Sequence, residues 1–307
     1  MLNGIISVLV VFLIIAVGFY FTKKNKWPES TSNVFSVTVI NIAAPALAIT
    51  TIENSFTHEV LFSSLRNVLI IAACFFTMYI FGRLLSVVMK MDKKKGAVFT
   101  TTFTFNNTIF IGLPVNQIIF GNEGLPYLFS YYFVSILLFW TLGALTLQSA
   151  SDKAAKSFSV KSVFSPGFFG VIIGCMLVVA ELHLPTILEK ALIYLGNICV
   201  PLSLLAIGSN LSKSFTISMK QISMDKIIIL LGKFVINPLL IWGVFSLWGM
   251  TGLPLKVFIL TASLPCHAQT AIMAEFYDLE KEYASNLVSL STLVSLITIP
   301  LYASILL

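Results

Sequence analysis

The feature that most constrains this chain is a series of long apolar stretches, separated by short clusters of charged and turn-forming residues. A helix needs roughly 20 apolar residues to cross the hydrocarbon core of a bilayer, and most of these stretches approach that length. Only 10% of the 307 residues are charged, whereas about a quarter are charged in soluble domains. The sequence therefore predicts an all-α integral membrane protein in a lipid bilayer. It excludes a soluble enzyme, a nucleic-acid-binding domain and a disordered chain.

Ten transmembrane helices are predicted from these stretches. The first stretch is followed by Lys23, Lys24 and Lys26, whereas a cleavable signal peptide carries its basic residues ahead of the apolar run. The first stretch is therefore predicted to be a membrane-spanning helix. The predicted helices cover approximately residues 3–22, 33–52, 66–89, 97–120, 125–147, 165–181, 188–210, 227–248, 255–277 and 282–306.

The basic residues predict the orientation, because cytoplasmic loops of membrane proteins are enriched in Lys and Arg. Most of the 19 basic residues follow the first, third, fifth and seventh predicted helices, while the alternate loops hold only Arg66, Lys190 and Lys256. We therefore expect a protein of the cell membrane (plasma or inner membrane) with both termini outside the cytoplasm. The connection at residues 278–282 is acidic and departs from this pattern, although acidic residues contribute little to the rule.

An internal repeat is visible in the pattern N-I-x-x-P, which occurs at Asn41–Pro45 and again at Asn197–Pro201. A second similarity, at nearly the same offset, relates the fourth and ninth predicted helices. Two five-helix halves are therefore predicted, residues 1–147 and 165–307, joined by a cytoplasmic linker at 148–164. Because five is odd, the halves would have opposite orientations, which is the inverted-repeat plan of secondary transporters.

Helix-breaking residues lie inside several predicted spans. Proline removes one intrahelical hydrogen bond and displaces the carbonyl four residues earlier, and in hydrocarbon the freed groups need another partner. Asn41 and Asn197 each precede a proline by four residues. Each is predicted either to satisfy such a carbonyl or to bind a ligand. The predicted helix breaks are Pro45, Gly112, Pro114 and Pro201.

The fourth and ninth predicted helices hold more polar residues than packing alone requires. If both helices break and cross, their half-helix N-termini meet near the midplane, where free N–H groups favour an anion such as a carboxylate. Asn41 and Asn197 would line the same site. The predicted binding residues in the two helices are Asn106, Asn107, Thr108, Pro265, Cys266, His267 and Gln269.

Few ionisable side chains are expected at depth. No carboxylate lies near the middle of a predicted span, and Glu275, near the end of the ninth, comes closest, whereas cation exchangers rely on buried Asp or Glu. Lys233 and Arg83 are predicted to extend their charged ends to the cytoplasmic face. His267 is predicted either to titrate near neutrality or to be a neutral hydrogen-bonding side chain. The four cysteines lack metal-ligand spacing, so no metal or cofactor is expected.

Two stretches carry a family resemblance. Asn106-Asn107-Thr108 through Ile111-Gly112-Leu113-Pro114 to Phe120-Gly121 is similar to the signature N-T-x-x-x-G-[IL]-P…[FY]-G of the auxin efflux carrier family, which includes bacterial malate and malonate permeases and the plant PIN carriers. The corresponding C-terminal signature resembles Leu264-Pro265 through Phe276-Tyr277-Asp278, and Ser291-Thr292 to Ile299-Pro300. One departure is that Asn106 stands where plant carriers have a proline, which leaves the break point in the fourth helix open.

The resemblance implies ten helices in two inverted repeats. Helices 1, 2, 6 and 7 would form a scaffold domain, and helices 3–5 and 8–10 a transport domain in which broken helices 4 and 9 cross. Elevator-type alternating access, organic-anion substrates and a homodimer formed through the scaffold are also implied. The asparagine that matches Asn107 contributes to the anion site in this family.

The sequence as a whole predicts a secondary transporter of small organic anions such as malate, malonate or auxin-like carboxylates. An enzyme is not expected, because no motif supplies a nucleophile or general base at depth. One alternative is a sodium-coupled symporter related to bile-acid carriers, with Gln269, Glu275 and the asparagines as cation ligands. The other is an anion-binding membrane sensor that does not transport.

Overall fold

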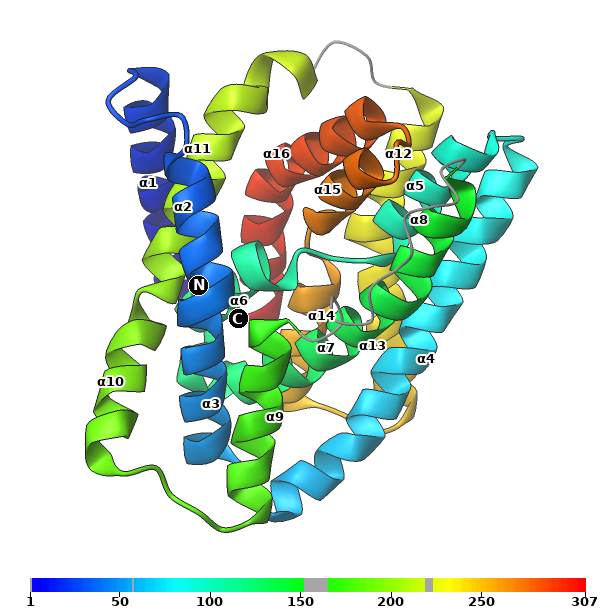
Figure 1. The fold of residues 1–307 in the computed structure, drawn as a ribbon. Coiled ribbons are helices and arrows are strands. Elements are labelled where there is room, and N and C mark those ends of the chain that lie inside the picture. Colours follow the sequence, from blue (N-terminus) through cyan, green and yellow to red (C-terminus); the bar gives the residue numbers. More distant parts are fainter. Residues whose placement is uncertain (1, 57, 152–164, 219–222) are drawn as a thin grey trace.

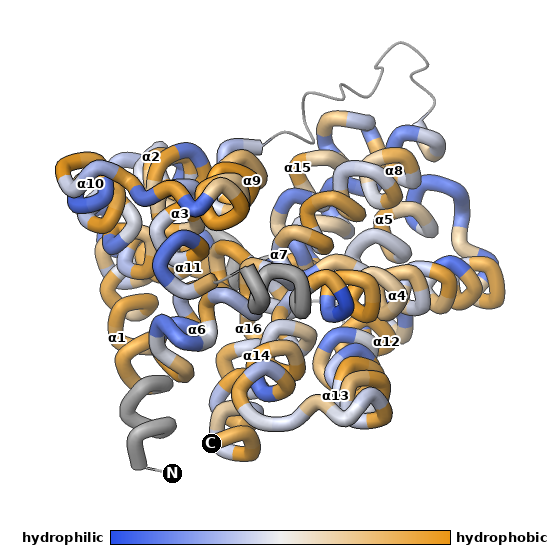
Figure 2. The backbone as a smooth tube through the Cα atoms, turned by 90° about the horizontal axis from the view of Figure 1, so that it is seen from below, coloured by the Kyte–Doolittle hydropathy of each residue, from blue (hydrophilic) through white to orange (hydrophobic). Residues whose placement is uncertain are grey.

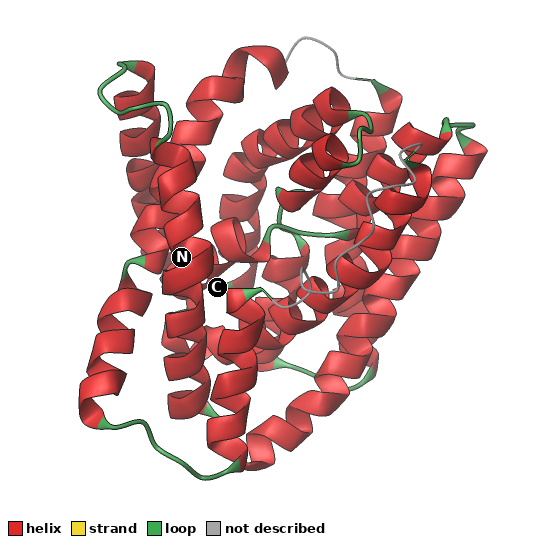
Figure 3. Ribbon diagram, viewed as in Figure 1, coloured by secondary structure: helices red, strands yellow, loops and turns green. Residues whose placement is uncertain are grey.

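The computed structural model describes residues 2–56, 58–151, 165–218 and 223–307, and in these residues every regular element is a helix (Figures 1 and 3). Six helical segments are long and apolar enough to cross a membrane, and four shorter apolar helices accompany them. The prediction of an all-α membrane protein is thereby confirmed. The six long segments are Thr31–Ser55, Leu65–Val88, Asn122–Ala150, Thr186–Ser212, Met224–Leu247 and Lys281–Leu306.

Each of the ten predicted stretches is mostly helical where the structure describes it, with the fourth interrupted at residues 105–107 and the ninth at 263–268, while the number that cross the membrane stays a prediction. The predicted linker falls largely on residues 152–164, which lie outside the described residues. The α-helices are α1 Leu2–Lys23, α2 Thr31–Thr38, α3 Ala44–Ser55, α4 His58–Val88, α5 Lys93–Thr104, α6 Leu113–Phe120, α7 Leu125–Leu138, α8 Ala144–Ala150, α9 Pro166–Val179, α10 Thr186–Asn197, α11 Cys199–Ser218, α12 Met224–Leu231, α13 Asn237–Leu247, α14 Gly252–Ala262, α15 Gln269–Phe276 and α16 Lys281–Leu306.

Three prolines inside the apolar segments lie at the start of an α-helix that follows a distortion, whereas Pro300 lies within α16. Pro45, Pro114 and Pro238 stand in the first turn of α3, α6 and α13, directly after the π-helical turns η1 Val39–Ala43, η2 Thr108–Gly112 and η6 Gly232–Ile236. Each of these α-helices continues directly from a π-turn with helical backbone, so the proline coincides with a local distortion inside a continuous helix. Pro201 follows a one-residue interruption between α10 and α11. Among the predicted breaks, only the stretch upstream of Gly112 and Pro114 opens into an extended segment.

The helices fall into two groups that Figure 2 shows on opposite sides of the molecule. The scaffold group contains α1–α3 and α9–α11, and within it α1 packs along α11 while α3 packs along α9. The crossing group contains α4–α8 and α12–α16, with α6 against α1 and α11, and α7, α14 and α16 next to it in Figure 2. The two groups contain the helices that the resemblance assigns to a scaffold and a transport domain.

Glycines bring the scaffold helices into close contact. A Cβ on Gly208 would overlap the Ile15 carbonyl oxygen of α1, and a Cβ on Gly18 would overlap the Leu205 carbonyl oxygen of α11. In the second pair, a Cβ on Gly170 would lie 2.7 Å from the Pro45 Cα. Small residues at such positions allow helix backbones to approach in a membrane, where the hydrophobic effect does not drive helix association.

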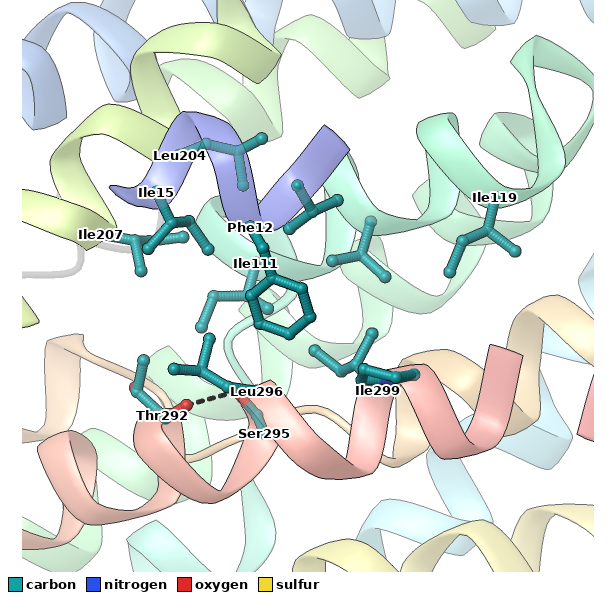
Figure 4. Close-up of a pocket in the computed structure, with 13 residues that line it drawn as sticks. Phe12, Ile15, Ile111, Ile119, Leu204, Ile207, Thr292, Ser295, Leu296 and Ile299 are labelled. Atoms are coloured by element: carbon teal, nitrogen blue, oxygen red, sulfur yellow. Dashed lines mark hydrogen bonds between the residues drawn. The ribbon is translucent and has the colours of Figure 1, made fainter. Parts of the chain in front are cut away.

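The contact between the two groups around α1, η2, α11 and α16 is apolar (Figure 4). It encloses a small cavity of about 20 Å³ whose polar side chains, Thr292 and Ser295, both donate to carbonyls of their own helix α16. Neither hydroxyl therefore links the crossing group to the scaffold group. The other side chains at this contact include Phe12, Ile15, Ile111, Leu204, Ile207, Leu296 and Ile299.

Candidate functional site

The centre of the crossing group is the point where two broken helices meet. One break separates α5 from η2, and the other separates α14 from α15. The Asn107 N–H donates to the Pro265 carbonyl at 2.9 Å, and the His267 N–H donates to the Phe105 carbonyl at 3.1 Å. Residues 106 and 266 therefore form an isolated antiparallel bridge. This pairing supplies backbone partners that unwound segments would otherwise lack in the membrane.

Asn106 connects the bridge to the surrounding helices. Its side chain is fully buried, and its amide nitrogen donates to the Tyr131 hydroxyl at 3.1 Å and to the Thr261 and Ala262 carbonyls at 3.2 and 3.1 Å. The Asn237 amide also donates to the Ala262 carbonyl, at 3.0 Å. The last carbonyls of a helix have no intrahelical donor, so these amides cap the C-terminal end of α14.

Lys233 lies beside the same bridge, and the prediction that it reaches the cytoplasmic face is wrong. Its side chain is 0% exposed. Its ammonium donates to the Phe105 carbonyl at 2.6 Å and to the Asn106 side-chain oxygen at 2.5 Å. The side chain turns inward because the open end of α5 offers these oxygens within reach of η6. Arg83, by contrast, is exposed.

A polar cavity of about 470 Å³ lies between this bridge and the scaffold group. Asn107, Ala268 and Gln269 line it from the two breaks, while α2, α11 and α16 form its other walls. A second hollow of about 210 Å³ shares Asn107 and Gln269 and adds His267. The polar side chains from the facing helices are Ser32, Asn33, Ser36, Asn210, Ser289 and Thr292, apolar ones include Val37, Ile40, Ala206, Ile207, Leu211 and Val288, and Glu29 lies in the lining just before α2.

Two predicted site residues, Asn107 and Gln269, face the cavity, and a third, His267, faces the second hollow. The Asn107 side-chain oxygen accepts from the Phe110 N–H at 3.3 Å. Gln269 is the first residue of α15. The His267 ring packs on Phe139 with centroids 4.4 Å apart, and its Nδ1 has no hydrogen-bond partner within the described residues. The side chains of Asn107 and Gln269 therefore give the cavity amide groups at the two breaks.

Other predicted residues build the bridge rather than line the cavity. Pro265 provides its carbonyl to Asn107. Buried Cys266 donates its N–H to the Ser291 hydroxyl at 3.1 Å. The hydroxyl of buried Thr108 donates a hydrogen bond to the Asn106 carbonyl at 3.4 Å. The break in the fourth predicted helix, left open by the sequence, is located at residues 105–107.

The two asparagines of the repeated pattern do not join this cavity. Asn41 is exposed and donates to the Val37 carbonyl of its own segment at 2.9 Å. Asn197 lines a separate cavity of about 240 Å³, together with Thr50, Asn54 and Gln117. Glu275, a predicted cation ligand in the sodium alternative, has a side chain 71% exposed and lies 3.7 Å from the Lys281 ammonium.

Sequence reasoning did not identify Lys233, Tyr131 and Asn237 as part of the crossing. Of the three, only Lys233 has a sequence feature that could have indicated its role, a charge within an apolar stretch. Tyr131 and Asn237 resemble ordinary polar residues of a helix until the fold brings them to Asn106 and Ala262.

The helices and the bridge define a polytopic membrane protein with a polar cavity at the meeting point of two broken helices. The model of the membrane transport protein family matches residues 3–303. An uncharacterized transporter of Methanothermobacter thermautotrophicus is 27% identical, covering 98% of this chain and 97% of the relative. Another from Methanocaldococcus jannaschii is 26% identical, covering 98% of each. The chain belongs to the membrane transport protein family, which is the auxin efflux carrier family, and it is a membrane transporter.

Proposed function

We propose that this protein is a secondary carrier of small organic anions, such as malate, malonate or auxin-like carboxylates, and that the polar cavity is its binding site. One observation carries the proposal: the cavity is lined at once by both helix breaks and by the scaffold group. The N-terminal ends of η2 and α15 open there beside Asn107 and Gln269. Their N–H groups and dipoles favour a carboxylate.

Alternating access by an elevator movement is part of the same proposal, and the presence of two helix groups supports it. The crossing group would slide against the scaffold group, and the apolar contact around α1 and α16 favours sliding because its hydroxyls bond within their own helix. Two inverted five-helix repeats with ten spans are supported by the paired contacts of α1 with α11 and of α9 with α3. In such a repeat, the first pair is the counterpart of the second.

A homodimer formed through the scaffold group is part of the same proposal. The outer surface of α10 exposes large apolar side chains, among them Ile187 at 87% and Tyr194 at 76%. A second copy or lipid would cover this surface in the membrane.

Transport in proteoliposomes tests the function. We expect uptake of labelled malate, malonate or indole-3-acetate by the wild type, and uptake at limiting substrate lower by about 10- to 100-fold in Asn107→Ala, the effect of removing one hydrogen bond to a charged group. Asn41→Ala is the matched control, since this exposed amide bonds only its own segment. Equal uptake by Asn107→Ala and wild type would contradict the site, and saturable binding without uptake would favour the sensor.

A further inference from the structure

The ammonium of Lys233 is the least expected group in the crossing. A charged side chain inside a membrane protein is costly and typically marks function. Lys233 lies in the apolar segment Met224–Leu247 and is completely buried. We propose that Lys233 is a built-in cation of the crossing: it occupies the oxygen site formed by the open end of α5 and gives the cavity its attraction for anions. The second part of this proposal rests on the proposed function.

The oxygens around Lys233 resemble a cation site. Transporters with broken helices coordinate their coupling cation through unwound carbonyls and the C-terminal ends of half-helices. Here the Phe105 carbonyl, just beyond α5, and the Asn106 side-chain oxygen both accept from the Lys233 ammonium. The buried carbonyls at the end of α14, which lack donors from their own helix, accept from the amides of Asn106 and Asn237. The protein's own donors therefore satisfy the oxygens that would hold a metal cation.

The charge of Lys233 has no carboxylate partner among the described residues. The three ion pairs found there involve Asp225, Glu53 and Glu275, each with another basic residue. The negative end of the α5 dipole offsets part of the charge. The positive charge that is left attracts an anion toward Asn107, the cavity residue that directly follows Asn106 of the bridge. A carboxylate bound at Asn107 would complete the neutralisation.

Ligand charge separates this role from a merely structural one. The probes are malonate, monomethyl malonate and dimethyl malonate, which carry two, one and no negative charges near neutral pH. In Lys233→Met we expect the affinity to fall by about tenfold for each ligand charge, because each negative charge loses its attraction to the ammonium. The affinity for the neutral diester should stay unchanged. Lys233→Arg should retain the preference for charge, and Lys190→Met, at an exposed residue, should behave as wild type.

Thermal unfolding tests the cation position without any anion. Lys233→Ala leaves the space of the ammonium empty, so the melting temperature of this variant should be lower than that of wild type. It should recover in ethylammonium chloride, whose cation fits this space, but not in choline chloride. Wild type should melt at the same temperature in sodium and potassium chloride. A saturable stabilisation of wild type by sodium, or no response of Lys233→Ala to ethylammonium, would overturn the built-in cation.

Ligand affinity and thermal unfolding together distinguish failure of the proposed function from failure of the built-in cation. An equal loss of affinity for all three malonate probes in Lys233→Met would overturn the charge role. If wild type binds none of the probes while ethylammonium rescues Lys233→Ala, the proposed function fails for this substrate class and the cation position stands.

Discussion

Replacing Gly208 with valine is expected to remove most of the folded protein, because it forces α1 away from α11. A Cβ at Gly208 would overlap the Ile15 carbonyl oxygen and lie 2.8 Å from the Phe19 nitrogen. Both are backbone atoms, so no change of rotamer relieves the overlap. Overpacking of a tight core costs about 1–3 kcal/mol when side chains can adjust. We expect about 3 kcal/mol or more here, since a whole helix must move.

Fluorescence size-exclusion chromatography of detergent extracts and thermal unfolding measure this effect. Gly243→Ala is the control, because a Cβ at Gly243 meets no atom within 4 Å. In the middle of α13 the alanine should be neutral or stabilising by up to about 1 kcal/mol. A monodisperse Gly208→Val protein with the melting temperature of wild type would contradict the close packing of α1 on α11.

Asn106→Leu is expected to dismantle the crossing of the two broken helices. The substitution removes the donor to Tyr131, Thr261 and Ala262 and the acceptor of Lys233. A buried polar group left without a partner costs about 1–3 kcal/mol, and loss of a partner of a buried charge costs about 3–5 kcal/mol. We therefore expect a destabilisation of about 3 kcal/mol or more and no measurable transport.

The measurement pairs thermal unfolding with uptake in proteoliposomes. Asn41→Leu is the matched control, since it replaces the same residue type at an exposed position with one hydrogen bond to Val37. Its unfolding temperature should stay near that of wild type. If Asn106→Leu unfolds at the wild-type temperature, the Asn106 contacts do not hold the crossing together.

Much of the fold could be predicted because membrane crossing imposes a length and a composition that are visible without any contact. The long apolar stretches are helical, and the polar run at Asn106 and Asn107 correctly indicated a break. Polar residues at depth are rare enough to mark such a place. The residues of the second break, Pro265 to His267, were identified for the same reason and do pair with the first break.

The direction in which a side chain points could not be predicted. Lys233 lies in a stretch where both the cytoplasmic face and the interior were within reach, and only the position of α5 relative to η6 determines that it turns inward. Asn41 and Asn197 share one sequence pattern, yet one bonds its own segment and the other lines a different cavity. Long-range packing, which a repeated pattern does not contain, decides between these outcomes.

The bridge between the two breaks also affects how the protein is made. Residues 106 and 266 are paired although the ribosome adds them 160 positions apart. During synthesis the amides of Asn106 and Asn107 enter the membrane before the carbonyls of Thr261, Ala262 and Pro265 exist. Until the second half is inserted, the polar groups of the first break lack the partners that they have in the final structure, and lipid offers none in their place. The crossing can therefore form only after most of the chain has been made.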